Sequence, residues 1–263
     1  QLGYSPNIMA RGLRTNLSMT VGMIVPDLTN PIFPPILRGA ENYLSAHGYT
    51  ALIANTDSRD SLELAAFNSL LARRVDGLIL ASGQTEPPLL VDAHKRDIKV
   101  VLVNRGTVDV PYPLVTGDDA AGTTAAVDHL AQLGHRHILH LSGPKNFTTS
   151  LVRSAAFIAG VSHHPGLHHE MLVAPSLSVE AGLATMDAYL SSGAIKATAI
   201  IAGNDLLALG IIRSLRTHGI ECPREISVVG FNDMPFAEDF GPPLTTVRIP
   251  HHEMGVESAR LLL

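Results

Sequence analysis

Polar residues follow directly after several apolar runs of this sequence, at positions where their side chains could bind a small ligand. They are Asn30, Asn104, Arg105, Asn204 and Asn232, and Arg248 lies within a late apolar stretch. Amide and guanidinium groups form hydrogen bonds with hydroxyl, carboxylate and phosphate oxygens. The alternative is that such residues only cap the helices that follow, and for Asp118 and Asp205 both interpretations stay open.

The sequence lacks the motifs of the common catalytic and phosphate-binding sites. It has no GxGxxG after a strand-like run, no GxxxxGK[ST], no HExxH and no GxSxG. HHEMG at 251–255 has the wrong spacing for a zinc-binding helix, and SGPKNFTTS has the wrong order for a phosphate loop. We therefore expect a binding protein rather than an enzyme, and no cofactor.

Two histidine clusters raise the question of a metal site. HHPGLHH spans 163–169, but no cysteine or acid completes a tetrahedral set at fixed spacing, so a solvated loop is the preferred interpretation. His137 and His140 are three residues apart, so on a strand they point to opposite faces and cannot chelate one ion. The sequence therefore predicts no metal site.

The composition describes a chain with ample material for a core. Its 263 residues are 46% hydrophobic with a net charge of −5, and Cys222 is its one cysteine, which fits a reducing compartment. The first residues do not resemble a signal peptide, and no apolar run approaches the roughly 18 residues of a membrane span. We expect a cytoplasmic protein without a membrane partner. The net negative charge disfavours nucleic-acid binding over the whole protein surface. Residues 1–26 are nevertheless locally cationic, because they contain Arg11 and Arg14.

A repeating pattern of strands and helices would position the candidate residues. The expected strands are mostly apolar on consecutive positions, which is typical of parallel strands covered on both faces. They span 20–26, 49–55, 75–82, 99–105, 113–117, 137–143, 171–175, 197–203, 226–231 and 245–249. The expected helices lie between them, at 34–46, 61–73, 87–96, 119–133, 150–160, 179–192, 205–218 and 251–263. This order predicts a doubly wound α/β architecture.

Ten strands fit two sheets of about five strands better than one sheet. The first sheet is expected to end near LSGPKNFTTS, where a proline and polar cluster follows the sixth strand, and TTVRIPHHE would cross back. This predicts a linker at 1–18, a first lobe of 19–143 with 249–263, and a second lobe of 144–248. Two such lobes make a cleft, and clefts at the carboxyl ends of strands bind small ligands.

Several stretches, in this order, make the chain similar to the lac-repressor/galactose-repressor (LacI/GalR) family of bacterial transcription regulators. They are LGYSPNIMARGLRT, VGMIVPDLTNPIF, HLAQLGHRHILHLSGP, NDLLALG, GIECPREISVVGFND and PPLTTVRIP. The resemblance covers essentially the whole chain. It implies two lobes like those of type I periplasmic binding proteins, a hinge helix, a helix-turn-helix headpiece preceding this sequence, a homodimer, and operator DNA as partner.

The resemblance assigns residues 7–14 to the hinge helix, which in the family enters the DNA minor groove. Leu13 matches the leucine that wedges between base steps, and flanking arginines favour the negative groove. The implied DNA-contacting residues are Asn7, Ala10, Arg11, Leu13 and Arg14. Gly12 is a departure, because glycine costs about 1 kcal/mol in a helix. Without DNA we expect residues 1–18 to be frayed.

An effector pocket is also implied by the resemblance. The matching positions are Asn30, Ile32, Phe33, Asn104, Arg105, Arg153, Leu177, Asn204, Asn232 and Arg248. Asn104 and Asn232 stand where many sugar-binding members of the family carry aspartate. The resemblance also brings three arginines, Arg105, Arg153 and Arg248, to this pocket. We therefore expect a net positive pocket and an anionic effector such as a sugar acid or sugar phosphate. The alternative is that some of these arginines face away or pair with Asp205 or Asp233.

These expectations favour an effector-responsive regulator of transcription, most simply a repressor. The effector would change DNA affinity only through its differential affinity for two states of the protein. A solute-binding protein of a transport system shares the two lobes, but LGYSPNIMARGLR argues against it. An enzyme on the same scaffold is less favoured, because no nucleophile–base pair is evident.

Overall fold

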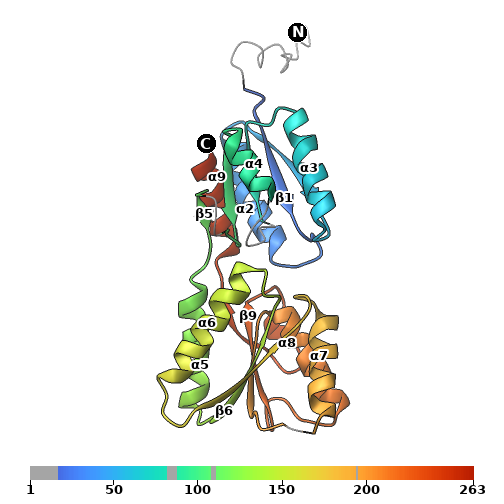
Figure 1. Ribbon diagram of the computed structural model, residues 1–263, viewed down its shortest axis with the longest axis vertical. Coiled ribbons are helices and arrows are strands. Elements are labelled where there is room, and N and C mark those ends of the chain that lie inside the picture. Colours follow the sequence, from blue (N-terminus) through green and yellow to red (C-terminus); the bar gives the residue numbers. More distant parts are fainter. Residues whose placement is uncertain (1–16, 82–87, 108–110, 194) are drawn as a thin grey trace. The chain divides into compact units, whose positions relative to one another are not determined.

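The computed structural model describes residues 17–81, 88–107, 111–193 and 195–263. The hinge residues assigned by resemblance, Asn7 to Arg14, lie outside these ranges. The chain divides into two compact units, which we call the first lobe (1–116 with 250–263) and the second lobe (117–249). Each lobe contains one five-stranded sheet with helices on its faces (Figure 1).

The sheet of the first lobe is parallel throughout, in the order β2-β1-β3-β4-β5. Its strands are β1 (Thr20–Val25), β2 (Thr50–Asn55), β3 (Gly77–Leu80), β4 (Val100–Val103) and β5 (Leu114–Val115). Its helices are α2 (Phe33–Ala46), α3 (Asp60–Ala72), α4 (Pro88–Lys95) and α9 (His251–Leu262). The central strands β3 and β4 are buried at every residue, which explains their uninterrupted apolar sequence.

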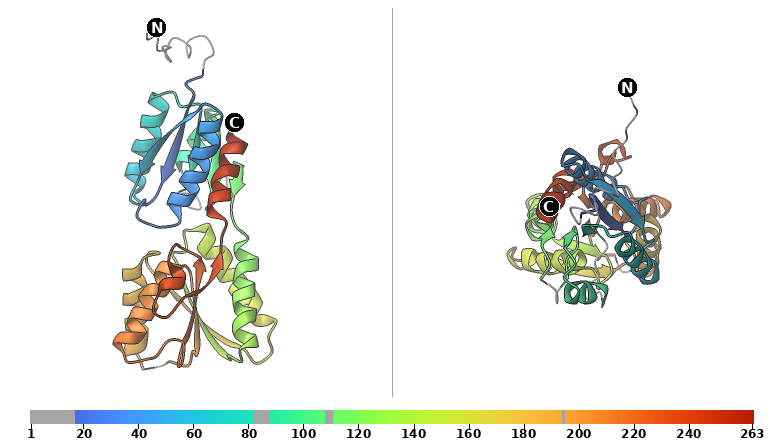
Figure 2. Two further views of the ribbon diagram at one scale, coloured as in Figure 1. Left: turned by 180° about the vertical axis from the view of Figure 1, so that it is seen from behind. Right: turned by 90° about the horizontal axis from the view of Figure 1, so that it is seen from above.

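Two helices from opposite ends of the chain pack together in the first lobe. Figure 2 shows α9 beside α2. Gly39 of α2 and Gly255 of α9 permit this packing, because a Cβ atom at Gly39 would collide with the His252 carbonyl oxygen and one at Gly255 with the Ile36 carbonyl oxygen. On the other side of the sheet, α3 and α4 bury Phe67, Leu70, Leu90 and Ala93 in an apolar cluster.

The second lobe repeats this design with the strand order β10-β9-β8-β6-β7, again all parallel. Its strands are β6 (His137–Ser142), β7 (His168–Val173), β8 (Ala199–Ala202), β9 (Ser227–Asn232) and β10 (Thr245–Arg248). Its helices are α5 (Asp119–Gln132), α6 (Thr148–Ser162), α7 (Val179–Ser191), α8 (Asp205–Thr217) and the short 3-10 helix η1 (Ala237–Asp239). One core lies under α7 and α8 and another under α5 and α6.

The predicted fold class is confirmed, but the predicted boundary between the lobes is wrong. The prediction placed 119–143 in the first lobe and 144–248 in the second, whereas the second lobe spans 117–249. Strand β6 pairs with β7 and β8, and α5 packs against α6, so both elements belong to the second sheet. Pro144 and the polar residues around it begin the turn into α6 and do not mark the lobe boundary. None of the helices in the described ranges is long and apolar enough to cross a membrane.

Candidate ligand-binding site

In a parallel sheet, the residues that follow each strand gather at one edge, which we call the carboxyl edge. In the first lobe, β1 leads into a tight turn that ends at α2. The Asn30 Oδ1 atom accepts a hydrogen bond from the Ile32 amide at 3.3 Å, and the Asn30 carbonyl accepts one from the Phe33 amide at 3.2 Å. Asn30 thus fixes the start of α2, and Ile32 and Phe33 are both buried.

The turn after β4 places two further candidates at the same edge. Asn104 adopts a left-handed conformation with φ of 70°, a region that asparagine tolerates better than most residues. Its amide donates to the Val115 carbonyl at 2.8 Å, and its own carbonyl accepts from the Thr116 hydroxyl at 3.3 Å. Arg105 follows and is only 5% exposed. The local backbone therefore holds the Asn104–Arg105 pair in a fixed turn.

Arg153 of α6 is the centre of the polar network at the carboxyl edge of the second sheet. Its Nε donates to Asp119 Oδ1 at 2.9 Å, and its Nη2 lies 2.8 Å from the same oxygen. Nη1 donates to the Gly203 carbonyl at 2.5 Å, and Nη2 reaches Asn232 Oδ1 at 3.4 Å. The guanidinium also lies over the Phe231 ring, 3.7 Å from its centroid. Groups from several separate segments therefore fix this one side chain.

The charges of Arg153 and Asp119 compensate one another away from water. Burial raises the pKa of Asp119, and the neighbouring Arg153 opposes that rise. Burial likewise lowers the pKa of Arg153, opposed by Asp119. A guanidinium stays protonated in proteins at any ordinary pH, and its charge favours the ionised form of the Asp119 carboxyl beside it. The second lobe thus presents N–H donors here without a net positive charge.

Asn204 is used partly as a helix cap. Its Oδ1 accepts from the Leu207 amide at 2.8 Å at the start of α8, and its Nδ2 donates to the Leu177 carbonyl at 3.3 Å. Asp118 caps α5 in the same way, through the Ala121 amide at 2.9 Å. The capping interpretation therefore holds for Asp118, and it accounts for the acceptor atom of Asn204.

Asp205 does not cap α8. Its two oxygens accept from the Met234 amide at 2.7 Å and from the Thr246 hydroxyl at 2.5 Å, which ties the turn after β9 and strand β10 to α8. Burial raises the pKa of Asp205 to about 6, although these hydrogen bonds favour the charged form. Its role in the fold is to join three segments.

Arg248 is held by a different carboxylate. Its Nε donates to Asp233 Oδ2 at 2.5 Å, and the arginine side chain is 84% exposed while that of Asp233 is 26% exposed. Asn232 pairs with Arg248 in the register of β9 and β10 and has a φ of 116°, so the chain turns sharply after β9. The alternative in which an arginine pairs with Asp233 is the one observed for Arg248.

The net positive pocket stays a prediction, but the second lobe gives it little support. Both of its candidate arginines have an aspartate partner, Asp119 for Arg153 and Asp233 for Arg248. Sequence reasoning missed Asp119 because it lies 34 residues before Arg153 and next to a capping aspartate. The signal available was the Asp118-Asp119 pair itself, since one carboxylate suffices for the cap.

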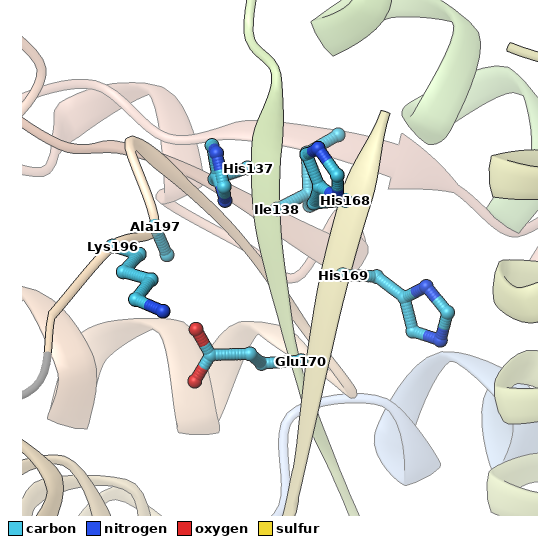
Figure 3. A pocket seen from close by; sticks show the side chains of 7 residues that line it. All are labelled: His137, Ile138, His168, His169, Glu170, Lys196 and Ala197. Carbon is cyan, nitrogen blue, oxygen red and sulfur yellow. The ribbon is translucent and has the colours of Figure 1, made fainter. Parts of the chain in front are cut away.

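A separate hollow of about 370 Å³ lies at the opposite edge of the second sheet, at the start of its strands. Figure 3 shows the Glu170 carboxylate and Lys196 ammonium pointing toward one another, and His169 on the other side of β7. The rings of His137 and His168 stack there at 4.7 Å. His168 and His169 belong to β7, so the prediction of a loop for 163–169 is wrong for its second histidine pair.

The histidines of this lobe point to both faces of its sheet. His140 lies on the α6 side, against Phe157, and its Nδ1 bonds to the Ile201 carbonyl at 2.9 Å. His137, three residues earlier, faces the hollow, as the strand geometry predicts. Among the described residues, no three histidine, cysteine or acidic side chains converge closely enough to hold a metal ion.

Comparison with known proteins agrees with this architecture. Residues 18–263 match the family of periplasmic binding proteins and sugar-binding domains of the LacI family. The transcriptional regulator MalR of Streptomyces coelicolor is 35% identical over 272 residues, which cover all of this chain and 77% of MalR. A LacI family regulator from Enterococcus faecium, solved with bound ribose, is 28% identical with a TM-score of 0.81, covering 92% of this chain and 88% of that one. The regulator CelR, solved with cellobiose, is 25% identical with a TM-score of 0.85, covering 100% and 85%.

Two parallel five-stranded lobes with polar carboxyl edges define a ligand-binding protein of the periplasmic-binding-protein type. The chain belongs to the LacI family of transcriptional regulators, and it comprises the effector-binding part of such a protein. The resemblance carried by its sequence motifs is thereby confirmed.

Proposed function

We propose that this chain is the effector-sensing part of a DNA-binding repressor and that its effector is an uncharged sugar. The observation that carries the second point is the buried Arg153–Asp119 pair, in which a carboxylate neutralises the arginine. A charged effector would gain little there, because the positive charge is already compensated. The pair still offers both donor and acceptor atoms.

Sugar hydroxyls suit such a mixed surface because each hydroxyl both donates and accepts hydrogen bonds. Arg153 donates, Asp119 accepts, and the Asn232 amide does both. Asn204 contributes only the second N–H of its Nδ2, because its oxygen caps α8 and its first N–H is bonded to the Leu177 carbonyl. In the first lobe, the proposed contact groups are the amides of Asn30 and Asn104, the guanidinium of Arg105 and the apolar side chains of Ile32 and Phe33. Leu177 and Arg248 complete the proposed contact residues of the second lobe. The sugars bound to the E. faecium relative and to CelR, ribose and cellobiose, are likewise uncharged.

The regulatory step follows from thermodynamic linkage. A sugar that binds one state of the protein more tightly shifts the population of that state, and operator affinity changes by the same coupling free energy. We propose that the protein works in this way as a cytoplasmic homodimer bound to operator DNA, and that it does not transform its effector. Incubating the bound sugar with the protein and recovering it unchanged tests the last point.

A thermal-shift screen tests the effector class. Neutral pentoses, hexoses and disaccharides are compared with sugar acids, sugar phosphates and purines. A ligand at about 100 times its Kd stabilises the folded state by about 2.7 kcal/mol, which is readily measured. We expect hits confined to neutral sugars, and Asn232→Ala should weaken them. A hit confined to sugar acids or phosphates, abolished in Arg105→Gln, would show that the first lobe decides the charge preference and would contradict the proposal.

A further inference from the structure

The loops that precede the strands of the first sheet carry a group of cations at the edge opposite the carboxyl edge. The turn from α3 to β3 contains Arg73 and Arg74. Lys95 is the last residue of α4, and the turn from α4 to β4 contains Arg96 and Lys99. We call these five residues the basic edge. All five are exposed. This concentration of positive charge contrasts with the net charge of −5 of the whole chain.

Most of these cations have no carboxylate partner among the residues that the structure describes. Arg96 forms an exposed ion pair with Asp92 at 3.1 Å. None of the ion pairs within the described ranges involves Arg73, Arg74, Lys95 or Lys99. Arg74 and Lys99 also line one shallow hollow of about 350 Å³, so the two cations can act on the same anionic group.

The acid that lines this hollow with them is already engaged. Asp76 accepts hydrogen bonds from the Ser18 amide at 2.8 Å, the Ser18 hydroxyl at 3.0 Å and the Met19 amide at 2.9 Å. These bonds hold the segment that leads into β1 against the start of β3. Asp97 is the other acid in these turns, so the basic edge keeps a positive excess.

The backbone at Arg74 supports a role for its side chain. The turns after α2, α5, α6, α7 and α8 each place a glycine at positive φ: Gly48, Gly134, Gly166, Gly193 and Gly219. The turns after α3 and α4 instead place Arg74 and Asp97 there, with φ of 55° and 54°. Aspartate tolerates this conformation better than most residues. A left-handed conformation disfavours a side chain, so an arginine at this position is not explained by the turn.

Stabilisation of the helix ends explains the presence of only some of the cations in the basic edge. Cations near the last turn of a helix interact favourably with its dipole, which fits Arg73 and Lys95. Lys99 directly precedes β4, where its carbonyl accepts from the Leu78 amide at 2.9 Å, and lies beyond that last turn. Arg74 likewise follows the C-cap residue of α3.

We propose that the basic edge binds the phosphate backbone of DNA, outside the contacts that select the operator sequence. This rests on the proposed function, because the segment entering β1 at Leu17–Met19 arrives at this same edge, and the family resemblance places the DNA-binding headpiece before it. Exposed lysine and arginine without acidic partners match the charge of phosphates and can release condensed counterions. The contacts add affinity without reading bases.

The test uses the full-length regulator, headpiece included, and a random-sequence DNA duplex several turns long. The variant Arg74→Gln/Lys99→Gln is compared with Arg136→Gln/Lys196→Gln, which removes two exposed cations preceding strands β6 and β8 of the second sheet. Binding constants are measured between about 50 and 200 mM salt. Equal thermal unfolding temperatures of wild type and both variants show that the fold is intact.

We expect the Arg74/Lys99 variant to bind roughly tenfold more weakly at low salt, with a slope of log K against log salt reduced by about 0.9 for each phosphate that the variant no longer neutralises. The Arg136/Lys196 variant should keep the wild-type slope. Equal slopes in all three proteins would overturn the proposal. Equal reductions of the slope in both variants would also overturn it, because net charge alone would then account for the effect. Failure of the proposed function is a separate outcome, in which the wild-type protein selects no operator from a random pool and no sugar changes its DNA binding.

Discussion

Arg153 directs its Nε and Nη2 atoms to the same carboxylate oxygen of Asp119, at 2.9 and 2.8 Å, and both side chains are more than nine-tenths buried. Such a pair adds little stability compared with apolar packing, yet breaking it by removing one partner is costly. The pair therefore acts mainly as a positioning device. It fixes a fork of donors at the carboxyl edge, and Asp119 itself determines the charge that a ligand meets.

Removing the Asp119 carboxylate tests this view. Asp119→Ala leaves the Arg153 guanidinium buried without its counter-ion, so we expect a loss of about 3–5 kcal/mol in the free energy of unfolding. The neighbouring change Asp118→Ala is the matched control, since it removes only a helix cap worth about 1 kcal/mol. Chemical denaturation measures both. Equal losses in the two variants would mean that Arg153 finds another partner or remains hydrated.

Acid should destabilise the second lobe through His140. Burial lowers the pKa of His140 from 6.5 to about 4, so the folded protein resists protonation that the unfolded chain accepts. Stability is unaffected above pH 6.5 and falls as the pH drops from about 6.5 to 4, by about 3 kcal/mol in total. His140→Leu should remove this effect, so the difference in unfolding free energy between wild type and variant should change across that window. A constant difference from pH 7 to 4 would contradict it.

Asp205 should act in the opposite sense. Burial raises its pKa from 3.8 to about 6, so the folded state binds the proton more tightly than the unfolded chain. Its contribution is largest below pH 3.8 and is lost as the pH rises to about 6, again by about 3 kcal/mol. Asp205→Asn cannot titrate, so it should gain stability relative to wild type as the pH rises through this window. Parallel pH profiles of the two proteins would show that the carboxyl is ionised throughout.

The sequence was sufficient for the fold class because its signals are local. Continuous apolar runs such as VVLV at β4 and AIIA at β8 are buried at every position, as expected of central parallel strands. The end of α2 at His47-Gly48 was predictable from the glycine, which adopts a φ of 79°.

Pairings between distant segments could not be predicted in the same way. The predicted lobe boundary was wrong because the sequence of β6 is compatible with either sheet. Only its pairing with β7 and β8 shows that it belongs to the second sheet. The acidic partners of the candidate arginines were missed or left open for the same reason. Arg153 and Arg248 were found from the family resemblance and from the position of Arg248 in a late strand, but their partners Asp119 and Asp233 depend on side-chain directions that no local pattern specifies.

Arg248 provides a test that separates ligand binding from stability. Its side chain is 84% exposed and its only ion-pair partner within the described ranges is Asp233, so Arg248→Gln should leave the unfolding temperature unchanged. If Arg248 contacts the effector, the same variant should bind the best sugar from the thermal-shift screen about tenfold more weakly, which corresponds to the removal of one hydrogen bond from a charged donor. Calorimetric titration measures the affinity. Arg224→Gln is the matched control, because Arg224 is also exposed and paired with a neighbouring acid, Glu221. Equal affinities in the two variants would remove Arg248 from the proposed contact residues.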